Sequence, residues 1–67
     1  MRNHIFLLWN LTNELRDLIM VQMWIDAARE GHPTNQRIQL ALDRRQDELN
    51  VRMDEIHNLM FDVSQNN

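Results

Sequence analysis

The only glycine and the only proline of this 67-residue chain stand two residues apart, in the stretch EGHPTNQ at residues 30–36. Glycine just beyond a helix end adopts the left-handed conformation at little cost, so Gly31 is expected to end one helix. Proline fits the first turn of a helix, so Pro33 is expected to begin another. Thr34 is the expected N-cap of the second helix, with His32 as the alternative.

Outside this stretch the chain is rich in Leu, Met, Arg, Gln and Glu and poor in β-branched residues, which favours helix. We expect one domain over residues 1–67, with a first helix over about 3–30, a turn at 31–33, a second helix over about 34–63 and a frayed tail at 64–67. A turn this short makes the two helices antiparallel neighbours. The predicted fold class is therefore all-α, an antiparallel helical hairpin.

Each predicted helix carries a stripe of residues at alternating spacings of three and four, the pattern of packed coiled-coil helices. The stripes are Leu8, Leu11, Leu15, Leu18, Gln22 and Ile25 in the first helix, and Gln39, Leu42, Gln46, Leu49, Met53, Ile56, Met60 and Val63 in the second. Folding the chain at residues 31–33 places Leu18 opposite Gln46, Gln22 opposite Leu42 and Ile25 opposite Gln39. The glutamine amides either form a polar layer that fixes the register or reach water at a loosely packed end, and we expect the second.

The stretch LIMVQMWIDAA, residues 18–28, is apolar on nearly every side of a helix, whereas one neighbouring helix covers only one side. A lone hairpin would leave a larger apolar patch in water than soluble monomers usually expose. A second copy packing on this patch would give a homodimeric four-helix bundle, and a different helical protein is the alternative partner. The expected interface residues are Met20, Met23, Trp24, Ala27 and Ala28, with a second contact by Phe6 and Trp9.

The composition limits the ways in which so short a chain is stabilised. It has no cysteine, so disulfides and thiolate metal sites are excluded, and association with another chain is the common remaining route. His4 and His57 are expected near each other at the open end of the hairpin, and Asp54 shares a helix face with His57. Such a set offers too few ligands for a metal site. We expect no metal, no cofactor and no catalytic residue.

Charge and hydropathy point away from nucleic acid and membranes. The net charge is −3, and acidic residues interleave with the arginines of the second helix. Arg44–Glu48 and Glu48–Arg52 are predicted ion pairs on an exposed face, so RNA binding, as in the dimeric hairpin regulators of some plasmids, is not favoured. The apolar run at residues 5–9 is shorter than a signal-peptide core, and no stretch is long enough to span a membrane. We expect a cytoplasmic protein.

Residues 31–43, GHPTNQRIQLALD, resemble the start of the second helix in the sporulation-type aspartyl-phosphate phosphatases. Those proteins are small helical hairpins with a turn before a Ser-Gln-x-Leu-Asp motif, and the five positions here read Gln39, Leu40, Ala41, Leu42 and Asp43. Leu42 and Asp43 match, whereas Gln39 and Leu40 replace the serine and the glutamine. The resemblance implies a phosphatase whose catalytic residue is Asp43.

The residues themselves favour a function without catalysis. Two thin helices enclose no pocket in which side chains could be activated, and the only serine, Ser64, lies in the predicted tail. The architecture is similar to that of the short hairpin co-chaperones of type III secretion systems. We therefore expect a self-associating interaction module: a small regulator, an adaptor or a chaperone-like subunit. The alternatives are the phosphatase acting through Asp43, an RNA-binding dimeric hairpin, and a bundle designed or selected to fold without biological activity.

Overall fold

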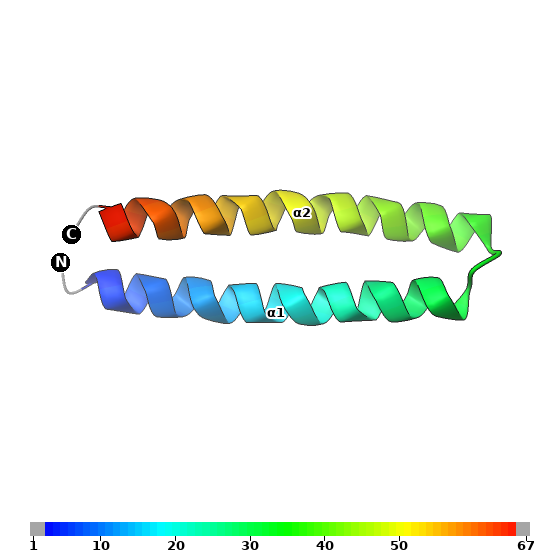
Figure 1. Cartoon of the computed structure of the whole chain (residues 1–67), viewed down its shortest axis with the longest axis horizontal. Helices are drawn as coiled ribbons and strands as arrows, with labels where there is room; N and C mark the ends of the chain where they lie inside the picture. The colour runs from blue at the N-terminus through cyan, green and yellow to red at the C-terminus, as the bar shows by residue number, and fades with distance from the viewer. Residues whose placement is uncertain (1–2, 66–67) are drawn as a thin grey trace.

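The computed structural model describes residues 3–65, which form two long helices, α1 (Asn3–Gly31) and α2 (Gln36–Gln65). The helices lie side by side and antiparallel, with both chain ends at one end of the molecule and the turn at the other (Figure 1). The backbone forms an elongated rod with principal extents of 51 × 15 × 11 Å. The predicted all-α antiparallel hairpin is confirmed.

The turn between the helices differs from the prediction at its glycine. Gly31 is the last residue of α1, and no glycine among the described residues has a positive φ, so the expected left-handed conformation is wrong. The amide of His32 instead donates to the carbonyl oxygen of Ala28 at 3.1 Å, which continues the helical pattern for one more bond. The chain then reverses at Pro33, where the amide of Asn35 donates to the carbonyl oxygen of His32 at 3.3 Å.

The N-cap of α2 is Asn35 and neither Thr34 nor His32. Its Oδ1 accepts a hydrogen bond from the backbone N–H of Ile38 at 3.1 Å, the contact expected of an N-cap with the third helical residue. Consequently α2 begins at Gln36, two residues later than predicted, and Pro33 precedes the cap instead of lying in the first helical turn.

The predicted frayed tail is wrong for the part of it that the structure describes. The helix α2 continues to Gln65. The hydroxyl of Ser64 supports this last turn, because it donates to the carbonyl oxygens of Met60 at 2.9 Å and Phe61 at 3.0 Å. Residues 66–67 of the predicted tail lie outside the described residues.

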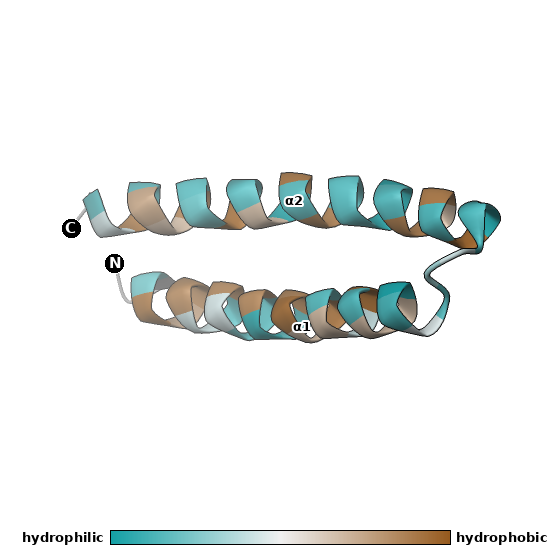
Figure 2. Ribbon diagram, turned by 45° about the vertical axis from the view of Figure 1, so that its right-hand side comes forward, coloured by the Kyte–Doolittle hydropathy of each residue, from teal (hydrophilic) through white to brown (hydrophobic). Residues whose placement is uncertain are grey.

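The core between the helices is a single layer of side chains. Among residues 3–65 the buried apolar side chains are Leu11, Ile25, Leu49, Ile56 and Val63, and all of them belong to the two predicted stripes. Ile56 is the best covered, at 0% exposure. In Figure 2 hydrophobic colour runs along the side of α2 that faces α1 and appears in separate patches on its outer side, whereas α1 shows it on several sides. One layer is what two helices alone can build, and it leaves much apolar surface uncovered.

The polar half of the seam is built from a closed pair of amides. Nε2 of Gln22 donates to Oε1 of Gln46 at 2.8 Å, and Nε2 of Gln46 donates back to Oε1 of Gln22 at 2.6 Å. The second N–H groups of the two amides reach Asp26 and Asn50, each at 3.1 Å. The expectation that these amides reach water at a loose end is therefore wrong, and they form the polar layer. Gln46 meets Gln22, one helical turn beyond the predicted Leu18.

The side chain of Gln39 forms hydrogen bonds with the end of α1 next to the turn. Its Nε2 donates to the carbonyl oxygens of His32 at 2.7 Å and Arg29 at 3.4 Å, and its Oε1 accepts from Nη1 of Arg29 at 3.3 Å. The last carbonyl groups of a helix have no partner within the helix, so this side chain supplies one. Gln39 thus meets Arg29, again one turn beyond the predicted Ile25.

Two ion pairs join the helices beside the seam. Arg52 forms a fork with Glu14, through Nε at 2.5 Å and Nη2 at 2.7 Å, and Arg29 meets Asp43 at 2.9 Å. The hydrogen bonds from Arg52 hold the pKa of Glu14 below its ordinary value, and the same bonds raise the pKa of Arg52 further above its usual range. Such partly exposed pairs add little stability, but their geometry favours this register over its neighbours.

Candidate interaction surface

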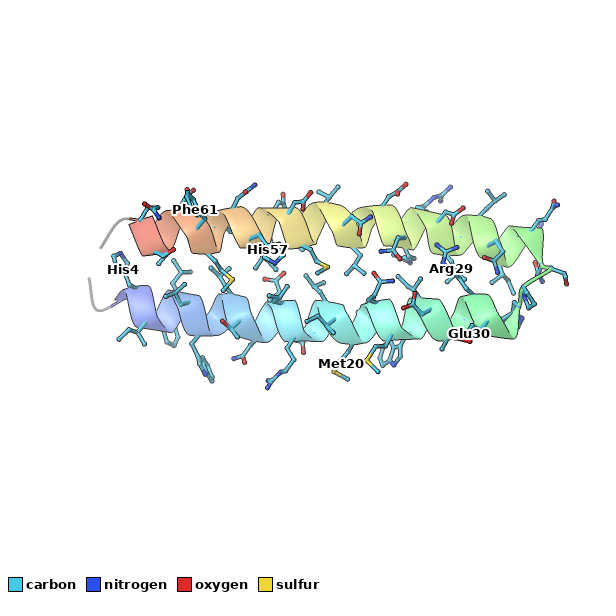
Figure 3. The ribbon with its side chains drawn as sticks, in the orientation of Figure 1. His4, Met20, Arg29, Glu30, His57 and Phe61 are labelled. Atoms are coloured by element: carbon cyan, nitrogen blue, oxygen red, sulfur yellow. The ribbon has the colours of Figure 1, made fainter. Side chains whose placement is uncertain are left out.

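The helix α1 carries a second stripe on the side opposite α2. Its members again follow spacings of three and four, so they share one helix face. Most are exposed, and Asn13 is half-buried. In Figure 3 Met20, near the middle of this stripe, points away from α2. We call this set the outer stripe: Phe6, Trp9, Asn13, Arg16, Met20, Met23 and Ala27.

Two apolar clusters make up most of this face. The N-terminal cluster consists of Ile5, Phe6 and Trp9, and the C-terminal cluster consists of Met20, Met23, Trp24 and Ala27. The two indoles are 62% and 68% exposed, at Trp9 and Trp24 respectively. Aromatic and thioether side chains are enriched at the centres of protein interfaces and depleted from ordinary surface. The composition of both clusters is therefore that of an interface.

A polar pair separates the two clusters. Arg16 donates from Nη2 to Oδ1 of Asn13 at 3.3 Å, within the outer stripe itself. These two side chains are the polar members of a stripe whose other members are all apolar. The outer stripe therefore reads as apolar, polar, apolar along α1.

The outer side of α2 has a different character. Leu40 is 69% exposed and Val51 is 60% exposed, but each is isolated. The residues three and four positions away from Leu40 are Gln36, Arg37, Asp43 and Arg44, and those around Val51 are Asp47, Glu48, Asp54 and Glu55. The described part of α2 contains ten Asp, Glu or Arg residues, against six in α1. Leu40 and Val51 are thus single apolar residues among mostly charged side chains, and Leu59 and Phe61 are exposed near the C-terminal end of α2, where Phe61 points away from α1 (Figure 3). The helix α1 instead gathers its exposed apolar residues into clusters along one face.

The exposed area of the chain is large for its mass. The solvent-accessible surface is 5599 Å². A compact monomer of the same 8.1 kDa would expose about 4,500 Å². The excess, roughly 1,100 Å², is of the size that one partner of a stable complex buries, about 800 Å².

Six of the seven predicted interface residues lie exposed on this side of α1: Phe6, Trp9, Met20, Met23, Trp24 and Ala27. Ala28 is half-buried, because it lies on the flank of α1 between the outer stripe and α2. That these residues form an interface stays a prediction. Sequence reasoning missed Ile5, Asn13 and Arg16, although the regular spacing from Phe6 to Ala27 would have placed the last two in the same stripe.

Two of the four arginines of α2, Arg45 and Arg52, form ion pairs with acids, and neither of the two predicted pairs is among them. Glu48 bonds Arg45 at 3.1 Å in place of the expected Arg44, and Arg52 bonds Glu55 at 3.2 Å as well as Glu14 across the seam. Acidic residues lie among the arginines along this helix. The outer side of α2 therefore carries charges of both signs, which does not favour binding to the phosphates of a nucleic acid.

Asp43, the residue singled out by the phosphatase resemblance, lies beside the seam near the turn. The side chain of Asp43 is 60% exposed, and its carboxylate forms an ion pair with Nη2 of Arg29 at 2.9 Å. No pocket forms among the described residues, so nothing around this carboxylate encloses a substrate. Its position is explained by the bond that it makes between the two helices.

The histidines do not come together as expected. Figure 3 places His4 at the open end of the hairpin and His57 farther along α2 toward its middle. Within residues 3–65 no group of three or more His, Asp or Glu side chains could hold a metal ion. The predicted approach of His4 and His57 is therefore wrong, since the register sets them at different heights.

Neither of the two described helices contains an apolar stretch long enough to cross a membrane. Comparison of the chain with protein-family models, with curated proteins and with solved structures finds no match.

Proposed function

We propose that this chain is a non-enzymatic interaction module that self-associates through the outer stripe of α1, as a dimer of two hairpins with four helices. The proposal rests on one observation, the contrast between the clustered apolar residues on the outside of α1 and the charged outside of α2. Such a dimer serves as a small regulator, adaptor or chaperone-like subunit that presents a helical surface to another protein.

The contrast between the helices supports a dimer in which α1 is central. Within one hairpin each helix has one neighbour, so both would need one apolar side only. A helix that is apolar on two opposite sides needs two neighbours, whereas α2 is built for one. If α1 packs on α1 of a second copy, α1 gains its second neighbour and α2 keeps its charged side in water.

The exposed area supports a second copy as the occupant. The surplus of roughly 1,100 Å² per chain exceeds the about 800 Å² that each partner buries in a stable complex. The outer stripe is one continuous face along α1, so a two-fold axis lets it cover itself without any other surface. A net charge of −3 per copy opposes association only weakly at physiological salt.

The test is the molar mass of the purified chain, measured by sedimentation equilibrium over a range of concentrations at low and high salt. We expect a dimer at both salt concentrations, because burial of apolar surface is little affected by screening. Trp24→Ala should weaken the dimer by about 2–4 kcal/mol, the range of a buried aromatic hot spot. A defined monomer at all concentrations, or aggregation without a defined size, contradicts self-association and points to a different partner protein.

Leu40→Ala is the matched control. Leu40 is 69% exposed and Trp24 is 68% exposed, but Leu40 lies on the charged side of α2. Its replacement should leave the dimer within about 0.5 kcal/mol of the wild type. Equal losses for both variants would show that exposure in general, and not the C-terminal cluster that contains Trp24, drives association.

A further inference from the structure

We infer that the outer stripe pairs with its own copy in the antiparallel sense, about a two-fold axis that passes between Asn13 and Arg16. This inference rests on the proposed self-association and specifies its geometry. It places the polar pair of each stripe opposite the polar pair of the other, at the centre of the interface. The N-terminal cluster of each copy then covers the C-terminal cluster of the other.

The spacing of the stripe leaves few possible alignments. Its members alternate between two kinds of position, one occupied by Phe6, Asn13, Met20 and Ala27 and the other by Trp9, Arg16 and Met23. In an antiparallel pair with knobs-into-holes packing, each layer joins one position of each kind. Two antiparallel registers keep most of the stripe in contact, and the parallel arrangement is the third possibility.

The register that we infer matches by type the six stripe residues from Phe6 to Met23. Phe6 lies opposite Met23 of the second copy, and Trp9 lies opposite Met20 of the second copy. Thioether sulfur and aromatic rings attract each other, so each of these layers gains a favourable sulfur–aromatic contact in addition to the burial of apolar surface. In the two central layers Arg16 lies opposite Asn13 of the second copy. The bond from Arg16 to Asn13 within one chain, at 3.3 Å, shows that these two groups satisfy each other.

The other two alignments place polar side chains opposite apolar ones, or arginine opposite arginine. In the second antiparallel register Arg16 lies opposite Met20 and Asn13 opposite Met23, so these polar groups would face apolar side chains and keep only the bond within their own chain. Phe6 would lie opposite Glu30 there. In the parallel arrangement each residue meets its own copy, which places Arg16 against Arg16 at the centre of an apolar face. Only the first register gives each Arg16 a polar partner on the second copy, with the two arginines one layer apart, about 4.5 Å along the helix axis.

The absence of native cysteine allows the geometry to be measured with one engineered label. Glu30 is exposed at the end of α1 beyond the inferred contact, so a spin label on Glu30→Cys leaves the interface intact. The rise of 1.5 Å per residue gives a separation along the helix of about 46 Å between the two labels in the inferred register. The second antiparallel register gives about 36 Å, and the parallel arrangement gives roughly 10 Å, the spacing of packed helices.

Double electron–electron resonance on the labelled protein, with its mass checked by sedimentation, separates every outcome. A dimer with a distance near the longest value supports the inference. A dimer with either shorter distance overturns the inferred register and leaves self-association standing. A monomer overturns the proposed function, and the inferred register with it.

Charge at position 13 gives a second, independent test. Asn13→Arg places an arginine opposite Arg16 of the second copy and should raise the dissociation constant at least tenfold. Asn13→Asp places a carboxylate there and should keep the constant within about threefold of the wild type, because it satisfies both arginines. Equal weakening by the two charges would mean that position 13 faces apolar residues, which overturns the inferred register. Far-UV circular dichroism of both variants checks that α1 stays helical.

Discussion

The Gln22–Gln46 amide pair makes a quantitative prediction about the stability of the hairpin. Two hydrogen bonds, at 2.8 and 2.6 Å, join these half-buried side chains. Each neutral bond contributes about 0.5–1.5 kcal/mol net, and partial exposure favours the lower half of that range. We therefore expect a coupling free energy of about 1–2 kcal/mol between the two positions.

A double-mutant cycle with Gln22→Leu and Gln46→Leu measures this coupling. Either single variant should unfold more easily, because the remaining amide loses its partner and faces leucine. The double variant should recover most of the loss, since two leucines extend the apolar seam. Unfolding in urea followed by far-UV circular dichroism gives the four free energies by linear extrapolation. All four proteins are compared at one concentration, because association adds to apparent stability.

Asp47 supplies the control for this cycle. It is exposed, next to Gln46 in sequence, and directed to the outer side of α2. Gln22→Leu combined with Asp47→Leu should be additive within about 0.3–0.5 kcal/mol. If the Gln22–Gln46 pair is equally additive, the amides are not bonded, and the register that places them opposite each other is refuted.

Three further changes test other parts of the hairpin. Ile56→Ala removes the best covered side chain of the described residues, at 0% exposure, and should cost about 2–4 kcal/mol in urea unfolding; a loss well below 1 kcal/mol would show that the seam is not closed there. Gly31→Ala should add about 0.4–1 kcal/mol, since the φ of Gly31 is not positive and the added Cβ meets no atom within 4 Å; destabilisation would indicate a left-handed turn. The lowered pKa of Glu14 means that its bond to Arg52 stabilises the fold above the ordinary value of 4.5 and is lost as the pH falls below it. Glu14→Gln should therefore unfold with a shallower dependence on pH below that value, and an unchanged acid titration would show that the pair does not form.

The helical hairpin follows from the sequence because its causes are local. One glycine and one proline interrupt a chain of helix-forming residues, and the stripes of spacing three and four mark the sides that pack. Every buried apolar residue among residues 3–65 belongs to those stripes. The details of the turn depend on which polar side chain satisfies the free amides. Asn35 competes with Thr34 for that role, and propensity alone does not separate neighbouring candidates of similar strength.

Counting outward from the turn predicts the wrong register. Placing the fold at residues 31–33 put Gln46 opposite Leu18 and Gln39 opposite Ile25. The structure matches polar groups with polar groups instead, as Gln46 bonds Gln22 and Gln39 bonds Arg29. An unmatched amide in a seam costs more than a shift of one turn, because the apolar residues interlock almost equally well in either position. Matching the polar members of the stripes would have predicted the observed register.

The same reasoning explains which side of α1 faces α2. Both stripes of α1 have the spacing of a packing seam, so apolar pattern alone does not choose between them. The inner side carries Glu14 and Gln22 at the heights where α2 offers Arg52 and Gln46. The outer stripe carries its polar groups elsewhere, and facing α2 they would lie against apolar residues. The polar side chains therefore decide that the stripe from Leu8 to Ile25 packs on α2. The outer stripe is left for a partner whose own polar groups match it.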